Sequence, residues 1–192
     1  GMKRDLTVVI DVGHGGNDPG KIGVDNVKEK DVNLQIALCL KAQLQARGVK
    51  VILTREGDVC LATNGATNKK VSDMHNRVSL INASGADYMI SIHQNSYPEA
   101  EISGPQVFYY GSSEMSKKLA EAVQAQLIVD LQPPKEREIK TGNDLYILKN
   151  SQCPGVIVEC GFLSNPTECE NLQNPQYQQA VAAAIARAIC KL

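Results

Sequence analysis

The sequence lacks tryptophan, and aromatic residues make up only 4% of its 192 residues, so aliphatic side chains must build the core. It also lacks an excess of charge of one sign, because 20 Lys and Arg residues face 21 Asp and Glu residues, for a net charge of −1. This balance argues against a nucleic-acid partner or an anionic membrane surface, since both favour strongly basic proteins. No apolar run approaches the ~20 residues that a membrane span requires, so none is predicted.

The six cysteines lack the C-x-x-C spacing that is typical of a cysteine-ligated zinc site. We expect free and mostly buried thiols, because unpaired cysteine behaves as a small hydrophobic residue. One or two disulfides are the alternative if the compartment is oxidising. The cysteines are Cys39, Cys60, Cys153, Cys160, Cys169 and Cys190.

No apolar stretch of a signal peptide follows the first four residues, Gly1-Met2-Lys3-Arg4. A glycine before the methionine is typical of a cloning remnant, so we expect residues 1–5 to be a lead-in and a native leader to have been trimmed. The length suits one domain over residues 1–192. A content of 43% apolar and 21% charged residues is that of an ordinary globular protein.

Strand-like and helix-like segments alternate along the chain. The expected strands are residues 7–11, 49–54, 88–92, 106–110, 145–148 and 156–159. The expected helices are residues 32–47, a helix that begins at Ser72, residues 113–131, and two helices that begin at Asn165-Pro166 and Asn174-Pro175. This alternation predicts an α/β fold: a single three-layer domain with a mostly parallel, twisted sheet of about six strands and helices on both faces.

Capping residues suggest where the helices begin and end. Asp31 is the expected N-cap of the helix over residues 32–47, and Gly48 is expected to end that helix. Ser72 is the expected cap of the next helix, and the polar residues 62–70 before it are expected to form a loop. In Asn165-Pro166-Thr167-Glu168 we expect a cap, a first-turn proline and a capping-box glutamate.

Metal-binding side chains recur beside the expected strands. His14 follows the first strand, His93 ends another, Glu159 ends a third, and Glu29 lies just before the first long helix. Proteins with parallel sheets bind their ligands beyond the carboxyl ends of the strands. We therefore expect these four side chains to lie together at that edge of the sheet. Two imidazoles and a carboxylate form a catalytic zinc site with an open position, and a second carboxylate would complete a metal hydrolase.

Each of these residues also has an ordinary structural explanation. A lone histidine at a strand end is usually a hydrogen-bonded surface residue, and Glu29 could simply interact with the helix dipole. Glu159 follows three apolar strand residues, where a carboxylate is costly to bury without a partner or a metal. The third histidine, His75, lies inside an expected helix and is interpreted as structural.

Four segments resemble, in order, the motifs of one bacterial enzyme family, the catalytic domains of zinc-dependent N-acetylmuramoyl-L-alanine amidases. The segments are residues 10–20 (IDVGHGGNDPG), 29–34 (EKDVNL), 91–95 (SIHQN) and 158–165 (VECGFLSN). The resemblance extends over nearly the whole chain. It departs from the family pattern at Val12, where the family usually has proline, and in a longer polar loop over residues 62–71.

The resemblance implies hydrolysis of the amide bond between N-acetylmuramic acid and L-alanine in peptidoglycan or a muramyl-peptide. It implies that His14, Glu29 and His93 bind one zinc ion, which activates a water molecule, and that Glu159 is the general base and acid. Further residues are candidates for orienting the ligands or contacting the substrate. They are Asp11, Asn33, Asn95, Arg55 and Arg77. A turn or capping role is the alternative for Asp11, and structural ion pairs are favoured for both arginines.

The family resemblance also suggests a biological setting. We expect a monomeric, bacterial autolysin outside the cytoplasm, secreted or in the cell wall or periplasm. Residues 94–105 leave no room for a long inhibitory helix, so we expect an open cleft, although an unidentified protein activator is a possible partner. Residues 144–148 (DLYIL) resemble the sporulation and germination branch. The alternatives are another zinc peptidase of the cell wall or a non-catalytic wall-binding relative.

Overall fold

The computed structural model describes residues 5–192, so the first four residues of the expected lead-in lie outside the described residues. The strands are β1 (Thr7–Val12), β2 (Lys50–Leu53), β3 (Tyr88–Asn95), β4 (Gln106–Tyr109), β5 (Lys140–Thr141) and β6 (Gly155–Phe162). The helices are the 3-10 helix η1 (Val24–Asn26) and the α-helices α1 (Glu29–Ala46), α2 (Lys69–Ala83), α3 (Glu114–Leu131), α4 (Tyr146–Asn150), α5 (Pro166–Gln173) and α6 (Pro175–Cys190).

The six strands form one sheet in the order β2-β1-β3-β6-β4-β5. β2, β1, β3 and β6 run parallel to one another, whereas β4 is antiparallel to β6 and pairs in parallel with the short β5. The prediction of a mostly parallel sheet of about six strands is therefore confirmed. β6 is the last strand of the chain, yet it lies in the interior of the sheet between β3 and β4.

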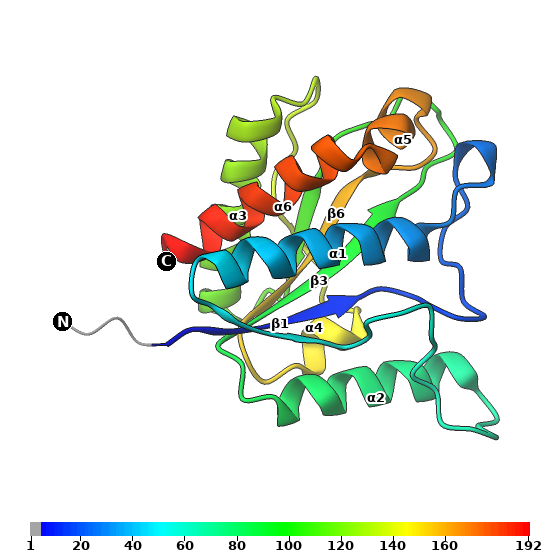
Figure 1. Ribbon diagram of the computed structural model, residues 1–192, viewed down its shortest axis with the longest axis vertical. Helices are drawn as coiled ribbons and strands as arrows, with labels where there is room; N and C mark the ends of the chain where they lie inside the picture. The colour runs from blue at the N-terminus through cyan, green and yellow to red at the C-terminus, as the bar shows by residue number, and fades with distance from the viewer. Residues whose placement is uncertain (1–4) are drawn as a thin grey trace.

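Helices cover both faces of the sheet, with α1, α3 and α6 on one face and α2 with α4 on the other (Figure 1). β1 shows how a run of apolar residues serves both layers. Val8 and Ile10 point into the larger core beneath α1 and α6, while Val9 points into the smaller core beneath α2. Successive residues of a strand alternate between its faces, so a continuous apolar segment is what a doubly covered strand needs.

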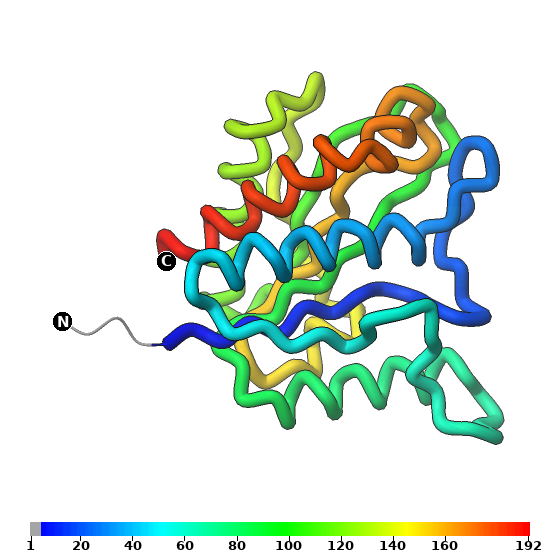
Figure 2. The backbone as a smooth tube through the Cα atoms, in the orientation of Figure 1, coloured from blue at the N-terminus to red at the C-terminus, as the bar shows by residue number. Residues whose placement is uncertain are grey.

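The loops that follow β1 and β2 leave the sheet at the same end. Figure 2 shows both at the right, residues 13–28 in blue and residues 54–68 in cyan to teal, away from the C-terminus. This is the edge at which parallel sheets bind ligands. The short segment from Ser96 to Pro105 contains no helix, as its length led us to expect.

The first long helix begins earlier than predicted. α1 starts at Glu29 with Lys28 as its N-cap, so the prediction of Asp31 as the cap is wrong. The carbonyl of Lys28 already accepts hydrogen bonds from the backbone N–H groups of Asp31 and Val32. Asp31 lies instead in the first turn, where its charge complements the helix dipole. Gly48 follows the end of the helix with a φ of +79°, as predicted.

The second helix also begins earlier, at Lys69. Asn68 is its cap and accepts a hydrogen bond from the backbone N–H of Val71, so the prediction of Ser72 as the cap is wrong. Ser72 Oγ instead accepts a hydrogen bond from the backbone N–H of Thr63 at 2.8 Å. The polar loop therefore ends at residue 68, and its first residues are tied to the helix that follows.

Residues 145–148 do not form the predicted strand. Leu145 is the N-cap of α4 instead, and residues 146–148 are its first three residues, of which Ile147 and Leu148 are buried in the smaller core against α2. An apolar run of four residues cannot distinguish a buried strand from a short buried helix. The two asparagine caps at Asn165 and Asn174 are confirmed, because each side chain accepts backbone N–H groups of its own first turn.

All six cysteines are free, as predicted. Only Cys160 and Cys169 are buried, however, so the expectation of mostly buried thiols is wrong. Cys190 is exposed and the other three are half-buried. Among residues 5–192, no helix combines the length and the apolar character that crossing a membrane would need.

Candidate metal centre and active site

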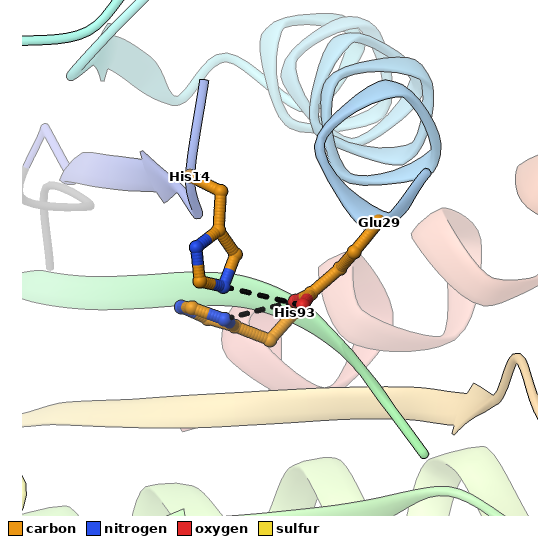
Figure 3. A group of neighbouring side chains, drawn as sticks. All are labelled: His14, Glu29 and His93. Carbon is orange, nitrogen blue, oxygen red and sulfur yellow. Dashed lines mark hydrogen bonds and ion pairs between the residues drawn. The ribbon is translucent and has the colours of Figure 1, made fainter. Parts of the chain in front are cut away.

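Three side chains from distant parts of the chain point toward one another at the carboxyl edge of the sheet (Figure 3). His14 Nε2 lies 3.2 Å from Glu29 Oε1, and His93 Nδ1 lies 3.1 Å from Glu29 Oε2. The two imidazole rings are nearly perpendicular, with centroids 5.1 Å apart. One potential ligand atom from each residue lies within 4.8 Å of the others. The structure thus brings together the three residues that the sequence nominated as metal ligands.

The backbone around these side chains leaves no space for bulkier residues. A Cβ atom on Gly13 would lie 2.6 Å from Cε1 of His93, and one on Gly20 would lie 2.6 Å from Oε1 of Glu29. His14 itself has a φ of +61°, which is uncommon for a residue with a side chain. Such conformations persist where the surrounding structure enforces them, often at functional sites.

Hydrogen bonds fix the orientation of the first histidine. His14 Nδ1 donates to Asp18 Oδ2 at 2.7 Å, which leaves Nε2 directed at Glu29. A carboxylate that holds the other ring nitrogen is the usual partner of a metal-ligating histidine. Sequence analysis missed Asp18, although it lies within the first motif, four residues after His14.

Glu29 is buried and held at both carboxylate oxygens. Oε1 accepts the backbone N–H of Lys21, and Oε2 accepts the backbone N–H of Gln94 and Nδ2 of Asn33. Burial alone would raise the pKa of Glu29, but hydrogen bonds from His14 and His93 hold it well below its usual range. Asn33 therefore orients the Glu29 carboxylate directly. Gln94 also holds this carboxylate, but nothing in the sequence indicated that role.

The cluster favours positive charge. Burial opposes protonation of His93, but its hydrogen bond to Glu29 and the charge of that carboxylate raise the pKa of His93 to about 9. Burial also opposes protonation of His14, but the hydrogen bond to Glu29, the charge of Glu29 and the hydrogen bond to Asp18 together raise the pKa of His14. Two imidazoles beside one buried carboxylate suit a divalent cation such as zinc. The residues present therefore fit a metal ion of this kind.

Glu159 lies beside this cluster on the neighbouring strand. It pairs in register with His93 across β3 and β6. Within residues 5–192 its Oε2 atom is buried without a hydrogen-bond partner, which is costly for a carboxylate. Burial raises its pKa to about 7, against the opposing charge of His93 and with support from that of Glu29. A carboxyl group with a pKa near neutrality is suited to proton transfer.

Asp11 and Arg77 lie next to the cluster and, within residues 5–192, make no hydrogen bond to its three side chains. The buried Asp11 carboxylate accepts hydrogen bonds from Thr54, Ser91 and Arg77. Arg77 also donates to the backbone carbonyls of Val12 and His14, the latter at 2.7 Å. The pair therefore fixes the backbone at the end of β1, which is consistent with the structural alternative for Arg77.

Arg55 also holds the backbone at the end of β1. It donates to the carbonyls of Val12 and Gly13 at 3.1 and 3.0 Å, and it also reaches that of Lys30. The backbone N–H of Val12 donates to Thr54 Oγ1, a hydrogen bond that the family's usual proline lacks. The Asn95 side chain accepts the N–H of Ser96 and makes no hydrogen bond to the three metal-site residues in the part of the chain described.

Replacing Arg77 with methionine is expected to lower the free energy of unfolding by about 3–5 kcal/mol, the usual effect of breaking a buried ion pair. The buried Asp11 carboxylate would lose its cation, the carbonyl of His14 would lose its donor, and the carbonyl of Val12 would keep only the donor from Arg55. Urea denaturation of the metal-free protein measures the effect. Arg187→Met, which removes an exposed ion pair with Asp130, is the control and should change stability by less than ~1 kcal/mol. Equal stability of the two variants would contradict the assignment.

Comparison with known proteins identifies the family. Residues 8–191 match the family model described as N-acetylmuramoyl-L-alanine amidase. The chain belongs to this amidase family. The match confirms the resemblance that the four sequence motifs indicated.

Several amidases are similar over nearly the whole chain. The germination-specific N-acetylmuramoyl-L-alanine amidase of Bacillus subtilis is 41% identical over 187 residues, which cover 96% of this chain and 78% of that protein. The CwlD amidase from Clostridioides difficile, solved in complex with the GerS lipoprotein, superposes with a TM-score of 0.93 at 38% identity, covering 97% of this chain and 98% of that one. The amidase LytC of Bacillus subtilis is 33% identical over 93% of this chain, which corresponds to 34% of LytC.

These similarities confirm the predicted fold and enzyme class. This amidase is a hydrolase of peptidoglycan. Its candidate site is the cluster of His14, Glu29 and His93 at the carboxyl edge of the parallel strands.

Proposed function

We propose that this amidase hydrolyses the bond between N-acetylmuramic acid and L-alanine with one zinc ion held by His14, Glu29 and His93, and with Glu159 as general base and acid. The observation that carries the proposal is the convergence of these three ligands, next to a carboxyl group with one buried and unpartnered oxygen. Two imidazoles and one carboxylate are the ligand set of catalytic zinc sites, which keep one position for water or substrate.

A zinc ion in this site supplies a Lewis acid that polarises the amide carbonyl and lowers the pKa of a water molecule. Glu159 accepts a proton from the attacking water, for which a pKa near 7 is well matched. It then gives this proton to the L-alanine nitrogen as the carbon–nitrogen bond breaks. Asp18 and Asn33 keep His14 and Glu29 oriented throughout.

The relatives support a more specific setting for the enzyme. We propose that it acts outside the cytoplasm, as an autolysin of the germination or sporulation branch, because a germination-specific amidase is 41% identical to it. The CwlD amidase was solved with a lipoprotein, which supports a protein partner of that kind here. We further propose that residues 5–192 form one domain that is monomeric by itself.

Digestion of purified peptidoglycan tests the proposed reaction. New L-alanine amino termini without new reducing sugar ends are expected, because the bond cleaved joins the lactyl group to L-alanine. Release of amino termini from internal residues of the peptide would instead indicate a zinc peptidase. Binding to the wall without any new amino terminus would indicate a non-catalytic relative.

A further inference from the structure

A pocket of about 410 Å³ adjoins the metal centre and extends away from it toward the start of α2. His14 and His93 lie at one end, and Lys69, Lys70 and Met74 of α2 lie at the other. Pockets of this size with a few polar groups are typical of ligand sites. This one is continuous with the proposed reaction centre, so a group held in it would be part of the same substrate.

The carboxylates that line this pocket already have hydrogen-bonding partners. Asp11 and Asp73 are bound by Arg77, at 3.0 and 2.8 Å, and Asp18 accepts a hydrogen bond from His14. Lys69 and Lys70 are exposed, and neither makes an ion pair with another residue in the described range 5–192, although the charge of Lys70 acts on Asp18 at longer range. These two lysines are therefore the cationic side chains of the pocket that have no close carboxylate partner.

The wall of the pocket next to the lysines is held firmly in place. The residues before the polar loop are tied to the first turns of α2. Leu61 N–H donates to Asp73 Oδ1 at 2.8 Å, and Asn76 Nδ2 donates to the carbonyl of Leu61. Cys60, the residue before Leu61, lines the pocket. The pocket is thus formed before any ligand binds, which reduces the entropic cost of binding.

We propose that Lys69 and Lys70 form a subsite for a free carboxylate of the peptide that is attached to muramic acid, on the L-alanine side of the bond that is cleaved. This inference rests on the proposed function. The N-acetylated sugars of the glycan are uncharged, whereas the peptide carries carboxylates, so the cationic end of the pocket selects the peptide. The nearest such group is the α-carboxylate of the acidic residue that follows L-alanine.

Two extended residues span roughly 7 Å. The carboxylate of the second residue therefore lies close to the alanine amide, on the part of the substrate that would enter the pocket shared by His14, His93 and the two lysines. Met74 and Pro19 provide apolar contacts along the way. Some bacteria amidate this α-carboxylate, and the amide has no charge. The subsite therefore discriminates between peptides with the free acid and peptides with the amide.

The test compares two muramyl tripeptides that differ only in whether the α-carboxyl group of the second residue is free or amidated. The wild-type protein is expected to cleave the acid with a kcat/KM roughly fivefold higher, the effect of one to two exposed ion pairs. The variant Lys69→Gln/Lys70→Gln is expected to lose this preference and to keep its rate on the amide. The variant Lys117→Gln/Lys118→Gln, an exposed pair on α3, changes the net charge equally and is expected to keep the preference.

Binding of the free peptides provides a readout that does not depend on turnover. Calorimetry of the acid and amide peptides, without muramic acid, should show roughly fivefold weaker binding of the acid to the Lys69/Lys70 variant, and no change for the amide. Equal preference in the wild-type protein and this variant, or no preference in either, would overturn the subsite. If neither tripeptide is cleaved by the wild-type protein, the proposed function fails, and the calorimetric comparison alone decides the subsite.

Discussion

Replacing Glu159 with glutamine is expected to reduce hydrolysis of muramyl-peptides by roughly 10³-fold, the usual contribution of a general base or acid. Glutamine has nearly the same shape but cannot accept the proton of the attacking water. Because Glu159 is not one of the three converging ligands, zinc binding is expected to stay within about twofold of the wild-type value. Initial rates on a soluble muramyl-peptide and a zinc titration with a competing chelator measure the two effects.

The control for this variant is Glu170→Gln, an exposed residue of α5 that makes the same chemical change away from the site. It should keep the full rate. A Glu159→Gln protein that retains the wild-type rate would show that the proton is transferred by another group. A large loss of zinc affinity in the same variant would show instead that Glu159 is a ligand.

Replacing His93 with alanine is expected to weaken zinc binding by more than roughly 100-fold and to abolish hydrolysis. The variant lacks one of only three protein ligands, and even the loss of a residue that orients a ligand costs roughly 10–100-fold in affinity. Asp18→Ala removes the residue that orients His14. Its loss of zinc affinity should be within that smaller range of roughly 10–100-fold. The same zinc titration ranks the two variants, and the wild-type protein should bind one ion per chain.

His75→Ala is the matched control, because this exposed histidine stacks on Tyr146 and is remote from the three converging residues. Its zinc affinity and rate should equal those of the wild-type protein. Exhaustive chelation of the wild-type protein should remove all activity, and added zinc should restore it. A preparation that stays fully active after chelation would refute metal dependence.

The arrangement of the metal centre was predictable because each candidate residue sits at an end of an apolar strand or of the first helix. In a parallel sheet those ends meet at one edge, so His14 and His93 could be placed together from sequence alone. The groups that hydrogen-bond to these side chains were harder to predict. Asp18 contacts His14 through a turn with left-handed backbone at His14 and Gly20. The backbone N–H of Gln94 reaches Glu29 at the point in β3 where its register with β6 shifts. No residue pattern specifies such geometry.

Element boundaries and one element type were harder to predict for a different physical reason. Local capping signals at Asp31 and Ser72 compete with residues three and four positions earlier, Lys28 and Asn68, and packing of the helix against the sheet decides between them. Residues 145–148 are apolar enough for either a strand or a helix, and burial of Ile147 and Leu148 against α2 requires the helix. Tertiary contacts that are distant in sequence therefore decided these cases.

The position of β6 has a consequence for the order in which the sheet can form. β6 is the last of the six strands along residues 5–192, yet both β3 and β4 pair with it. A polypeptide that stops short of residue 155 therefore has a divided sheet, in which β3 and β4 lack the neighbour that joins them. These two strands are consecutive along the chain, but they become parts of one sheet only after the strand between them has been synthesised.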